Sequence, residues 1–290
     1  MSKLTDIGNI KELLSRHGFR FSKAMGQNFL VNPSICPRMA QACGAGSTTG
    51  VLEIGPGIGV LTCELAGLAK KVVSIELDKR LLPILNETLS EFSNVSIINA
   101  DILEVDLRRL LKEEFSGMPV DVCANLPYYI TSPVIMKLLE ERLPIRSITV
   151  MVQKEAAERI CALPGTREAG AVSLAVRYYA EPQLLFRVSR GSFLPSPNVD
   201  SAVIRLHLRN TPPGHVEDEA YFFRVIKSAF GQRRKTLLNS LSAGLTLPKA
   251  LISELLSQAR LPAQSRAEQL TMEDFIRLSN LLFLHQFSNP

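Results

Sequence analysis

The stretch Glu53-Ile54-Gly55-Pro56-Gly57-Ile58-Gly59 decides the fold of this chain. It overlaps the end of a short apolar run, Gly50 to Ile54, that is typical of a buried strand, and it leads into an apolar segment with helical periodicity. Its glycines predict a tight strand-to-helix turn at which the backbone can approach a ligand closely. In open α/β sheets ligands bind outside the carboxyl ends of the strands, where this turn lies. A tight turn without a ligand is the alternative.

Further strands are predicted on the C-terminal side of this turn. Short β-branched runs alternate with amphipathic segments long enough for crossover helices, and these runs are Lys71–Glu76, Val95–Asn99, Val120–Asn125 and Arg146–Gln153. This order predicts a parallel, doubly wound α/β sheet. Two later runs, Phe186–Val188 and Ser201–Leu208, are joined by a Pro-rich connection and predict an antiparallel edge.

The C-terminal part of the chain has a different pattern. Thr211-Pro212-Pro213-Gly214 breaks both helix and strand and predicts a linker. Helical periodicity follows in four segments, which are Asp218–Phe230, Arg233–Leu241, Pro248–Gln258 and Thr271–Leu284. The sequence therefore predicts an α/β domain over residues 1–210 and a small all-helical domain over residues 211–290.

Composition excludes several classes of protein. The 290 residues are 46% apolar, which suffices for a full core and a second domain. No run of about 20 uncharged apolar residues is present, so we expect a cytoplasmic protein without a membrane span. The five cysteines include no C-x-x-C pair, and the four histidines lack metal-ligand spacing. We therefore expect neither a disulfide framework nor a metal site.

The positive charge is concentrated in the C-terminal segment. The formal net charge is +5, and residues 221–290 hold nine Lys or Arg against four Asp or Glu, which accounts for the whole excess. A basic appendage on a neutral body is typical of a protein with a polyanionic partner. A charged surface that only maintains solubility is the alternative.

Carboxylates end the next two predicted strands. Glu76 closes one strand and can accept hydrogen bonds from both hydroxyls of a ribose. Asp101 follows the next and can accept a hydrogen bond from the exocyclic amine of an adenine. For each residue alone, a cap on the following helix is an alternative.

The run Asn125-Leu126-Pro127-Tyr128 follows the fourth strand and points to methyl transfer. An exocyclic adenine amine is a poor nucleophile, because its lone pair is delocalised into the ring. The side-chain carbonyl of Asn125 and the backbone carbonyl of Leu126 can each accept one amine hydrogen, with Pro127 fixing the backbone between them. Tyr128 offers a face on which the base can stack. A proline turn beside a buried tyrosine is the alternative.

Together these motifs resemble the small-subunit (16S-type) branch of the ribosomal RNA adenine N6-dimethyltransferases. Further matching motifs are Gly26-Gln27-Asn28-Phe29-Leu30, Phe193-Leu194-Pro195-Ser196-Pro197 and Val199-Asp200-Ser201. The resemblance implies a class I (Rossmann-like) methyltransferase fold and S-adenosylmethionine as cofactor. It also implies, as substrate, two adjacent adenines near the 3′ end of 16S rRNA in the small ribosomal subunit, and a role in ribosome biogenesis. The cofactor site expected from it comprises Asn28, Leu30, Gly55, Gly57, Glu76, Asp101, Ile102 and Asn125.

The resemblance also extends the expected catalytic set, which comprises Asn125, Leu126, Pro127, Tyr128 and Phe193. Phe193 would lie on the target-base side opposite Tyr128, whereas packing beneath the Pro-rich loop is its alternative role. The basic residues Arg233, Arg234 and Lys235 head a predicted helix and are the best candidates for contact with the RNA backbone. A solvated helix start is the alternative for them. We expect a monomer.

Three other functions remain to be compared with this one. A dinucleotide-binding oxidoreductase would carry G-x-G-x-x-G, whereas the turn here reads G-x-G-x-G. An oxidoreductase also has no use for Asn-Leu-Pro-Tyr. A large-subunit rRNA adenine methylase would share the catalytic half, but the basic segment and long helical tail argue against it. A binding or assembly factor on the same fold stays open, because fold alone does not exclude it.

Overall fold

The computed structural model of the chain describes residues 2–22, 26–232 and 234–287. The chain divides into two compact units. The first, here called the sheet unit, extends to Ala157 and takes in Glu181–Leu208. The second, the helical unit, consists of Glu158–Ala180 and the chain from Arg209 onward.

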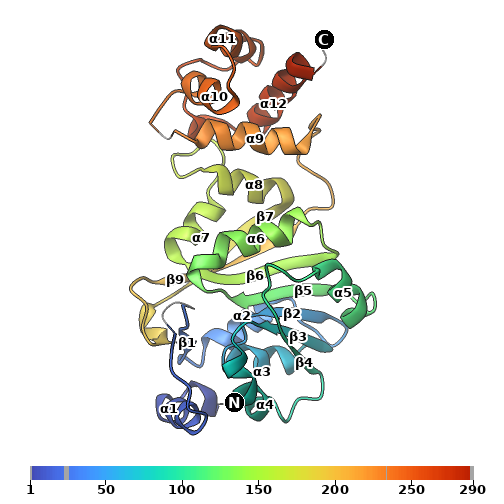
Figure 1. The fold of residues 1–290 in the computed structure, drawn as a ribbon, viewed down its shortest axis with the longest axis vertical. Helices are drawn as coiled ribbons and strands as arrows, with labels where there is room; N and C mark the ends of the chain where they lie inside the picture. Colours follow the sequence, from blue (N-terminus) through green and yellow to red (C-terminus); the bar gives the residue numbers. More distant parts are fainter. Residues whose placement is uncertain (1, 23–25, 233, 288–290) are drawn as a thin grey trace. The chain divides into compact units, whose positions relative to one another are not determined.

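Seven strands of the described chain form the central sheet (Figure 1). Their order across the sheet is β4 (Val95–Asn99), β3 (Lys71–Glu76), β2 (Gly50–Ile54), β5 (Val120–Asn125), β6 (Ile145–Gln153), β9 (Ser201–Leu208) and β7 (Ala180–Val188). Strands β4 to β6 pair in parallel, and β9 pairs antiparallel with β6. The chain moves outward from β2 to β3 and β4 and then returns to β5 on the other side of β2. This reversal makes the carboxyl ends of β2 and β5 the switch point at which α/β sheets bind ligands.

The predicted doubly wound sheet with an antiparallel edge is confirmed, and five predicted strands have the predicted bounds. Strand β6 begins one residue earlier than expected, at Ile145. The prediction for β7 was too short, because the strand begins at Ala180 and not at Phe186. Its first half contains Pro182 among polar residues, which hides the strand pattern. Such residues are tolerated here because β7 lies at the edge of the sheet.

Apolar side chains of the helices in the sheet unit pack on and beside the sheet. The helices that lie wholly or partly in this unit are α1 (Ile7–Arg16), α2 (Ile35–Cys43), α3 (Val60–Ala66), α4 (Leu82–Thr88), α5 (Leu107–Phe115), α6 (Thr131–Glu140) and the first half of α7 (Lys154–Cys161). One core cluster joins α2 and α3 to the strands. A second joins α1 to α4, which lie side by side in Figure 1. The N-terminal helix is therefore part of the packed body of this unit.

A second, two-stranded ladder brings distant parts of the sequence together. Strand β1 (Phe29–Leu30) pairs antiparallel with β8 (Phe193–Leu194), so that Phe29 lies opposite Leu194 and Leu30 opposite Phe193. The N-terminal segment and the Pro-rich loop, two of the motifs that carry the resemblance, are thus direct neighbours.

The helical unit contains the end of α7 and five further helices of the described chain, which are α8 (Ala171–Tyr179), α9 (Glu219–Phe230), α10 (Leu237–Leu245), α11 (Lys249–Gln258) and α12 (Met272–Phe287). The predicted helix over Arg233–Leu241 was wrong in its start. Thr236 occupies the N-cap position with an extended backbone, and α10 runs from Leu237 to Leu245. Its start places Leu237 and Leu241 in the core and keeps the cations out of the first turn, where the helix dipole opposes them.

The sequence boundary at residues 210 and 211 did not anticipate that residues 158–180 join the helical unit. An aromatic cluster accounts for the grouping, because Tyr178 and Tyr179 of α8 pack against Phe222 and Phe223 of α9. Both tyrosine hydroxyls also donate to the carboxylate of Glu219, at 3.2 and 2.7 Å. Across the described residues, the structure contains no helix with the length and apolar character needed to span a membrane.

Candidate active site

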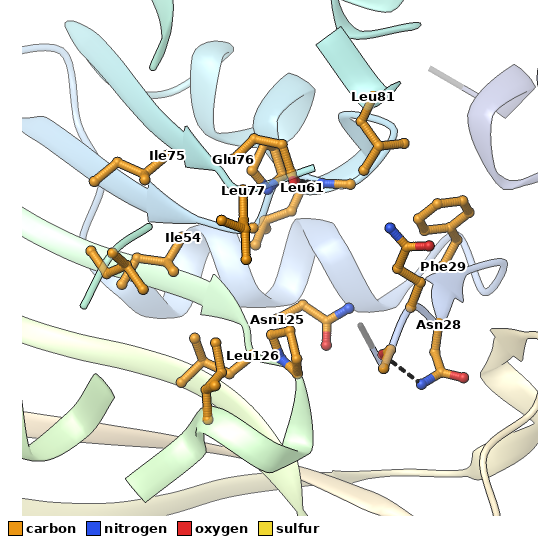
Figure 2. A pocket seen from close by; sticks show the side chains of 18 of the residues that line it. Asn28, Phe29, Ile54, Leu61, Ile75, Glu76, Leu77, Leu81, Asn125 and Leu126 are labelled. Carbon is orange, nitrogen blue, oxygen red and sulfur yellow. Dashed lines mark hydrogen bonds between the residues drawn. The ribbon is translucent and has the colours of Figure 1, made fainter. Parts of the chain in front are cut away.

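A cavity of about 280 Å³ lies at the carboxyl ends of β2, β3 and β5, at the switch point of the sheet. Its lining includes the cofactor residues expected from the sequence, which are Asn28, Leu30, Gly55, Gly57, Glu76, Asp101, Ile102 and Asn125. It also includes the expected catalytic residues Leu126, Pro127, Tyr128 and Phe193. Figure 2 shows Glu76 and Asn125 at strand ends, with Asn28 and Phe29 entering from the N-terminal segment. The structure thus brings the two predicted sets together around one cavity.

The glycine turn after β2 forms one wall of this cavity. Gly55 and Gly57 have φ values of 70° and 62°, a left-handed conformation that favours glycine. A Cβ on Gly55 would meet no atom of the protein, so this part of the backbone faces open space. A Cβ on Gly57 would lie 3.3 Å from the ring of Phe29. The turn therefore presents bare backbone to the cavity and holds Phe29 against it.

Glu76 is a buried carboxylate at the end of β3, with 6% of its surface exposed. Its Oε1 accepts from the backbone N–H of Asp78 at 2.7 Å, and its Oε2 accepts from that of Gly57 at 3.4 Å. Burial raises the pKa of Glu76 to about 6, although both backbone donors act in the opposite direction. The cap of the short helix that follows, η2 (Lys79–Leu81), is Asp78 and not Glu76. The carboxylate of Glu76 is thus held in place without serving as a cap.

Asp101 is half-buried after β4 and lines the same cavity. Its Oδ1 accepts from the backbone N–H of Leu103 at 2.9 Å. It therefore closes the turn that follows the strand, from a position at the cavity. The alternative considered for it, a cap on the following helix, was wrong, because the N-cap of α5 is Asp106.

The segment after β5 lines the cavity and is held by contacts with β6 and β9. Asn125 ends the strand, and Figure 2 shows its side-chain amide on the side that faces the N-terminal segment. The backbone N–H of Leu126 donates to the carbonyl of Met151 at 3.2 Å, which fixes this residue to β6. Pro127 then has an extended backbone and caps η3 (Tyr128–Ile130). The Tyr128 hydroxyl lies 2.7 Å from that of Ser201, whereas Tyr129 is exposed.

Phe193 lies both at the cavity and in the core. It lines the cavity, and it is buried in the core cluster that contains Leu30 and Val188. Pairing of β8 with β1 explains this arrangement, since it sets Phe193 opposite Leu30. Asn28 precedes this ladder, and its Nδ2 donates to the carbonyl of Gly26 at 3.0 Å (Figure 2).

Sequence reasoning missed the apolar lining of the cavity, which includes Phe29, Leu61, Ile75 and Leu81. In the sequence these residues resemble ordinary core positions. It also gave no role to Glu53, a buried residue whose Oε2 accepts from the hydroxyls of Thr62 and Ser74 at 2.7 and 2.6 Å. Burial raises the pKa of Glu53 to about 7. A glutamate within a strand that is otherwise apolar was the available signal.

The predicted RNA contacts belong to the helical unit. Arg234 and Lys235 are exposed in the turn before α10, and Arg233 lies outside the described residues. No group of three or more His, Cys, Asp or Glu side chains in the described ranges is arranged to hold a metal ion.

Comparison with known proteins agrees with these features over nearly the whole chain. Residues 18–283 match the family model for ribosomal RNA adenine dimethylase. Ribosomal RNA small subunit methyltransferase A of Geobacillus sp. (strain WCH70) is 50% identical over 279 residues, covering 95% of this chain and 96% of that protein. The protein of the same name from Bacillus mycoides (strain KBAB4) is 47% identical over 292 residues, covering 99% of this chain and 100% of the relative.

Two solved structures share the fold. A dimethyladenosine transferase from Plasmodium falciparum is 26% identical with a TM-score of 0.71, covering 89% of this chain and 98% of that one. The 23S rRNA methyltransferase ErmE is 27% identical with a TM-score of 0.68, covering 88% and 99%. The match of the family model and the identity to full-length relatives lead to one assignment: this chain belongs to the ribosomal RNA adenine dimethylase family.

Proposed function

We propose that the cavity binds S-adenosylmethionine together with an adenine of 16S rRNA, and that the chain methylates the N6 atoms of two adjacent adenines near the 3′ end of that RNA. The product is N6,N6-dimethyladenosine in the small ribosomal subunit, and the role is in ribosome biogenesis. As a member of its family, the chain is an S-adenosylmethionine-dependent rRNA adenine methyltransferase. The observation that carries the proposal is the position of Asn125-Leu126-Pro127-Tyr128 in the same cavity as the glycine turn and Glu76.

The groups that line the cavity suit the cofactor. The backbone at Gly55 faces open space, so a ligand can approach it closely. Glu76 has a carboxylate that suits two ribose hydroxyls, and Asp101 can accept from the adenine amine. Apolar walls that include Ile75, Ile102 and Leu81 suit the faces of the flat base. When bound, S-adenosylmethionine supplies an electrophilic methyl group on a positively charged sulfur.

On the target side, this chain's own groups prepare the amine. The Asn125 side-chain carbonyl and the Leu126 backbone carbonyl accept one amine hydrogen each, which draws the nitrogen toward tetrahedral geometry and directs its lone pair. Tyr128 stacks on the base, with Phe193 on the opposite side. Stacking on an aromatic ring contributes roughly 1–3 kcal/mol per base, which offsets part of the cost of unstacking the adenine. We expect the proton to leave to water after transfer.

The helical unit provides the contact with the rest of the RNA. Arg234 and Lys235 are exposed cations on one turn, and Arg233 adjoins them in sequence. Phosphate contacts by such residues supply affinity without reading the base sequence. The proposed division of labour is therefore a catalytic domain over residues 1–210 and an RNA-binding domain over residues 211–290. We expect the protein to act as a monomer in the cytoplasm.

Two alternatives remain. Methylation of large-subunit RNA is the weaker one, because full-length small-subunit methyltransferases are 47–50% identical to this chain whereas the 23S rRNA methyltransferase is 27% identical. A role in RNA binding alone would leave the Asn125-Leu126-Pro127-Tyr128 arrangement without a use.

The test is methyl transfer from tritiated S-adenosylmethionine to small ribosomal subunits that lack adenine methylation, followed by digestion and identification of the nucleosides. Dimethyladenosine made by the parent protein but not by Asn125→Ala would support the proposal. Transfer to large-subunit RNA, or no transfer at all, would overturn it.

A further inference from the structure

Asp78 is a buried carboxylate that adjoins the cavity without lining it. Its side chain is 4% exposed. Oδ1 accepts from Nε of Arg80 at 2.8 Å and from the backbone N–H of Arg80 at 3.1 Å. Oδ2 accepts from Nη2 of Arg80 at 2.6 Å and from Nε2 of Gln27 at 2.8 Å. These four donors use the carboxylate fully, and the arginine holds the pKa of Asp78 below its usual range.

The backbone of the same residue fixes Glu76. The N–H of Asp78 donates to Oε1 of Glu76 at 2.7 Å, so the position of Asp78 sets the position of the carboxylate proposed to bind the ribose. A shift of this turn would move Glu76 directly, because only Leu77 separates the two residues.

The side chain of Asp78 connects this turn to the N-terminal segment. Gln27, which donates to Asp78, also accepts from the backbone N–H of Ser22 at 3.0 Å. Arg80, the other partner of Asp78, lies over the ring of Phe19 with 5.1 Å between the guanidinium carbon and the ring centroid. Gln27 lines the cavity together with Asn28 and Phe29, which follow it directly. The group Gln27, Asp78 and Arg80 is called the Asp78 clasp below.

We propose that Asp78 is a positioning residue for cofactor binding. Through the Asp78 clasp it holds the N-terminal wall of the cavity, at Gln27 to Phe29, in a fixed place relative to Glu76, which forms the wall at the end of β3. Fixing both walls before binding lowers the ordering cost of binding and thereby raises affinity. The inference rests on the proposed function in one respect, namely that the ligand of this cavity is S-adenosylmethionine.

Asp78→Asn is the variant that isolates the clasp. Asn is as good a helix cap as Asp, so η2 keeps its start. With its carbonyl oxygen kept on that cap, its amide nitrogen must face Gln27 Nε2 and Arg80 Nη2, which are both donors. Gln27→Leu breaks the same contact from the other side. The matched control is Glu87→Gln. Glu87 of α4 also holds the N-terminal part of the chain, because its carboxylate pairs with Arg16 and His17 at 2.7 Å each, but it makes no bond to Glu76.

The measurement is the Kd of S-adenosylhomocysteine for the full chain by calorimetry, with kcat on small subunits at saturating S-adenosylmethionine as a second readout. We expect Asp78→Asn and Gln27→Leu each to raise Kd about tenfold, as for one charge-assisted hydrogen bond. The double variant should bind S-adenosylhomocysteine no more weakly than the single variant with the higher Kd. We expect kcat and the unfolding temperature to change little, and Glu87→Gln to stay within about twofold of the parent Kd.

Three results would overturn the proposal. Parent-like Kd in Asp78→Asn would do so while leaving the proposed function intact, provided that Glu76→Gln still weakens binding. An equal loss in Glu87→Gln would show that general tethering of the N-terminal segment, and not the clasp, sets affinity. Absence of binding to the parent protein would overturn the proposed function and this inference with it.

Discussion

The hydroxyl of Tyr128 lies 2.7 Å from the hydroxyl of Ser201, across 73 residues of sequence. Ser201 is fully buried at the start of β9, so it is a fixed anchor for the hydroxyl end of the tyrosine. Burial raises the pKa of Tyr128. Either hydroxyl can be the donor in this contact. The ring proposed to stack on the target adenine is therefore held at both ends, by the backbone of η3 and by Ser201.

We predict that Ser201→Ala and Tyr128→Phe lower kcat/KM for small subunits by a similar, few-fold factor, since each removes one neutral hydrogen bond worth about 1 kcal/mol. The double variant should lose no more than the worse single variant, because both substitutions remove one shared contact. Tyr128→Ala, which also removes the stacking face, should lose more, by roughly 1–3 kcal/mol in transition-state stabilisation. Additive losses in the double variant would contradict a shared role.

Gly55→Ala should abolish or strongly weaken cofactor binding. A Cβ there meets no protein atom, so the methyl group would enter the space reserved for the ligand. The matched control is Gly117→Ala, because Gly117 also has a positive φ, of 78°, and also has open space around its Cβ position. Both variants should lose about 1–2 kcal/mol of stability from backbone strain. Only Gly55→Ala should raise the Kd of S-adenosylhomocysteine. Equal Kd values for Gly55→Ala and Gly117→Ala would contradict the prediction.

Cofactor affinity should fall in mild acid because of Glu76. Its pKa is raised to about 6 in the free protein, and the charged form is the better acceptor for ribose hydroxyls. Binding therefore favours the deprotonated state, and affinity is lost as pH falls through about 6. We expect Kd to rise roughly tenfold from pH 8 to pH 5, one unit below that pKa. In Glu76→Gln this part of the pH dependence should vanish, with weaker binding throughout.

The sequence was sufficient to predict those parts of the site that depend on neighbours in the chain. Strand bounds followed from β-branched runs, and the polar residues Glu76, Asp101 and Asn125 were found because each lies at or just after the end of a predicted strand. Carboxyl ends of parallel strands meet at one edge of the sheet, so their proximity could be inferred without coordinates.

Contacts between distant segments could not be predicted in this way. The ladder of Phe29–Leu30 with Phe193–Leu194 is two residues long on each side, which is too short for a periodic signal. The contact of Gln27 with Asp78 and that of Tyr128 with Ser201 join single side chains across 51 and 73 residues. Such pairs depend on how the finished fold places each loop, and no local propensity encodes them.

Glu53 should make the folded protein less stable as pH rises. Its pKa is about 7 in the folded state against an ordinary value of 4.5, so between these values the folded chain binds a proton that the unfolded chain does not. This contribution is fully present below about pH 4.5 and is lost as pH rises through about 7. Oε1 of Glu53 is buried and has no hydrogen-bond partner in the described part of the chain. The charged form of Glu53 therefore lowers the free energy of unfolding by about 3 kcal/mol.

Glu53→Gln removes this titration while keeping an acceptor for Thr62 and Ser74. Urea unfolding at pH 5, 6, 7 and 8 should therefore show a smaller decline in the free energy of unfolding for the variant than for the parent. Parallel curves for the two proteins would mean that Glu53 does not titrate in this range.

Arg234 and Lys235 should contribute to RNA affinity and not to cofactor binding or methyl transfer. Both are exposed in the turn before α10, where they add positive charge without packing in the core. Each phosphate contact releases counterions, so the logarithm of affinity falls with the logarithm of salt concentration by about 0.7–0.9 per contact. We expect Arg234→Ala and Lys235→Ala each to reduce this slope by about that amount in binding to unmethylated small subunits. Binding of S-adenosylhomocysteine should be unchanged, and Lys249→Ala, which removes an exposed cation of α11, should leave the slope at its parent value. An unchanged slope in both Arg234→Ala and Lys235→Ala would remove this turn from the RNA interface, because a phosphate contact cannot be lost without a change in counterion release.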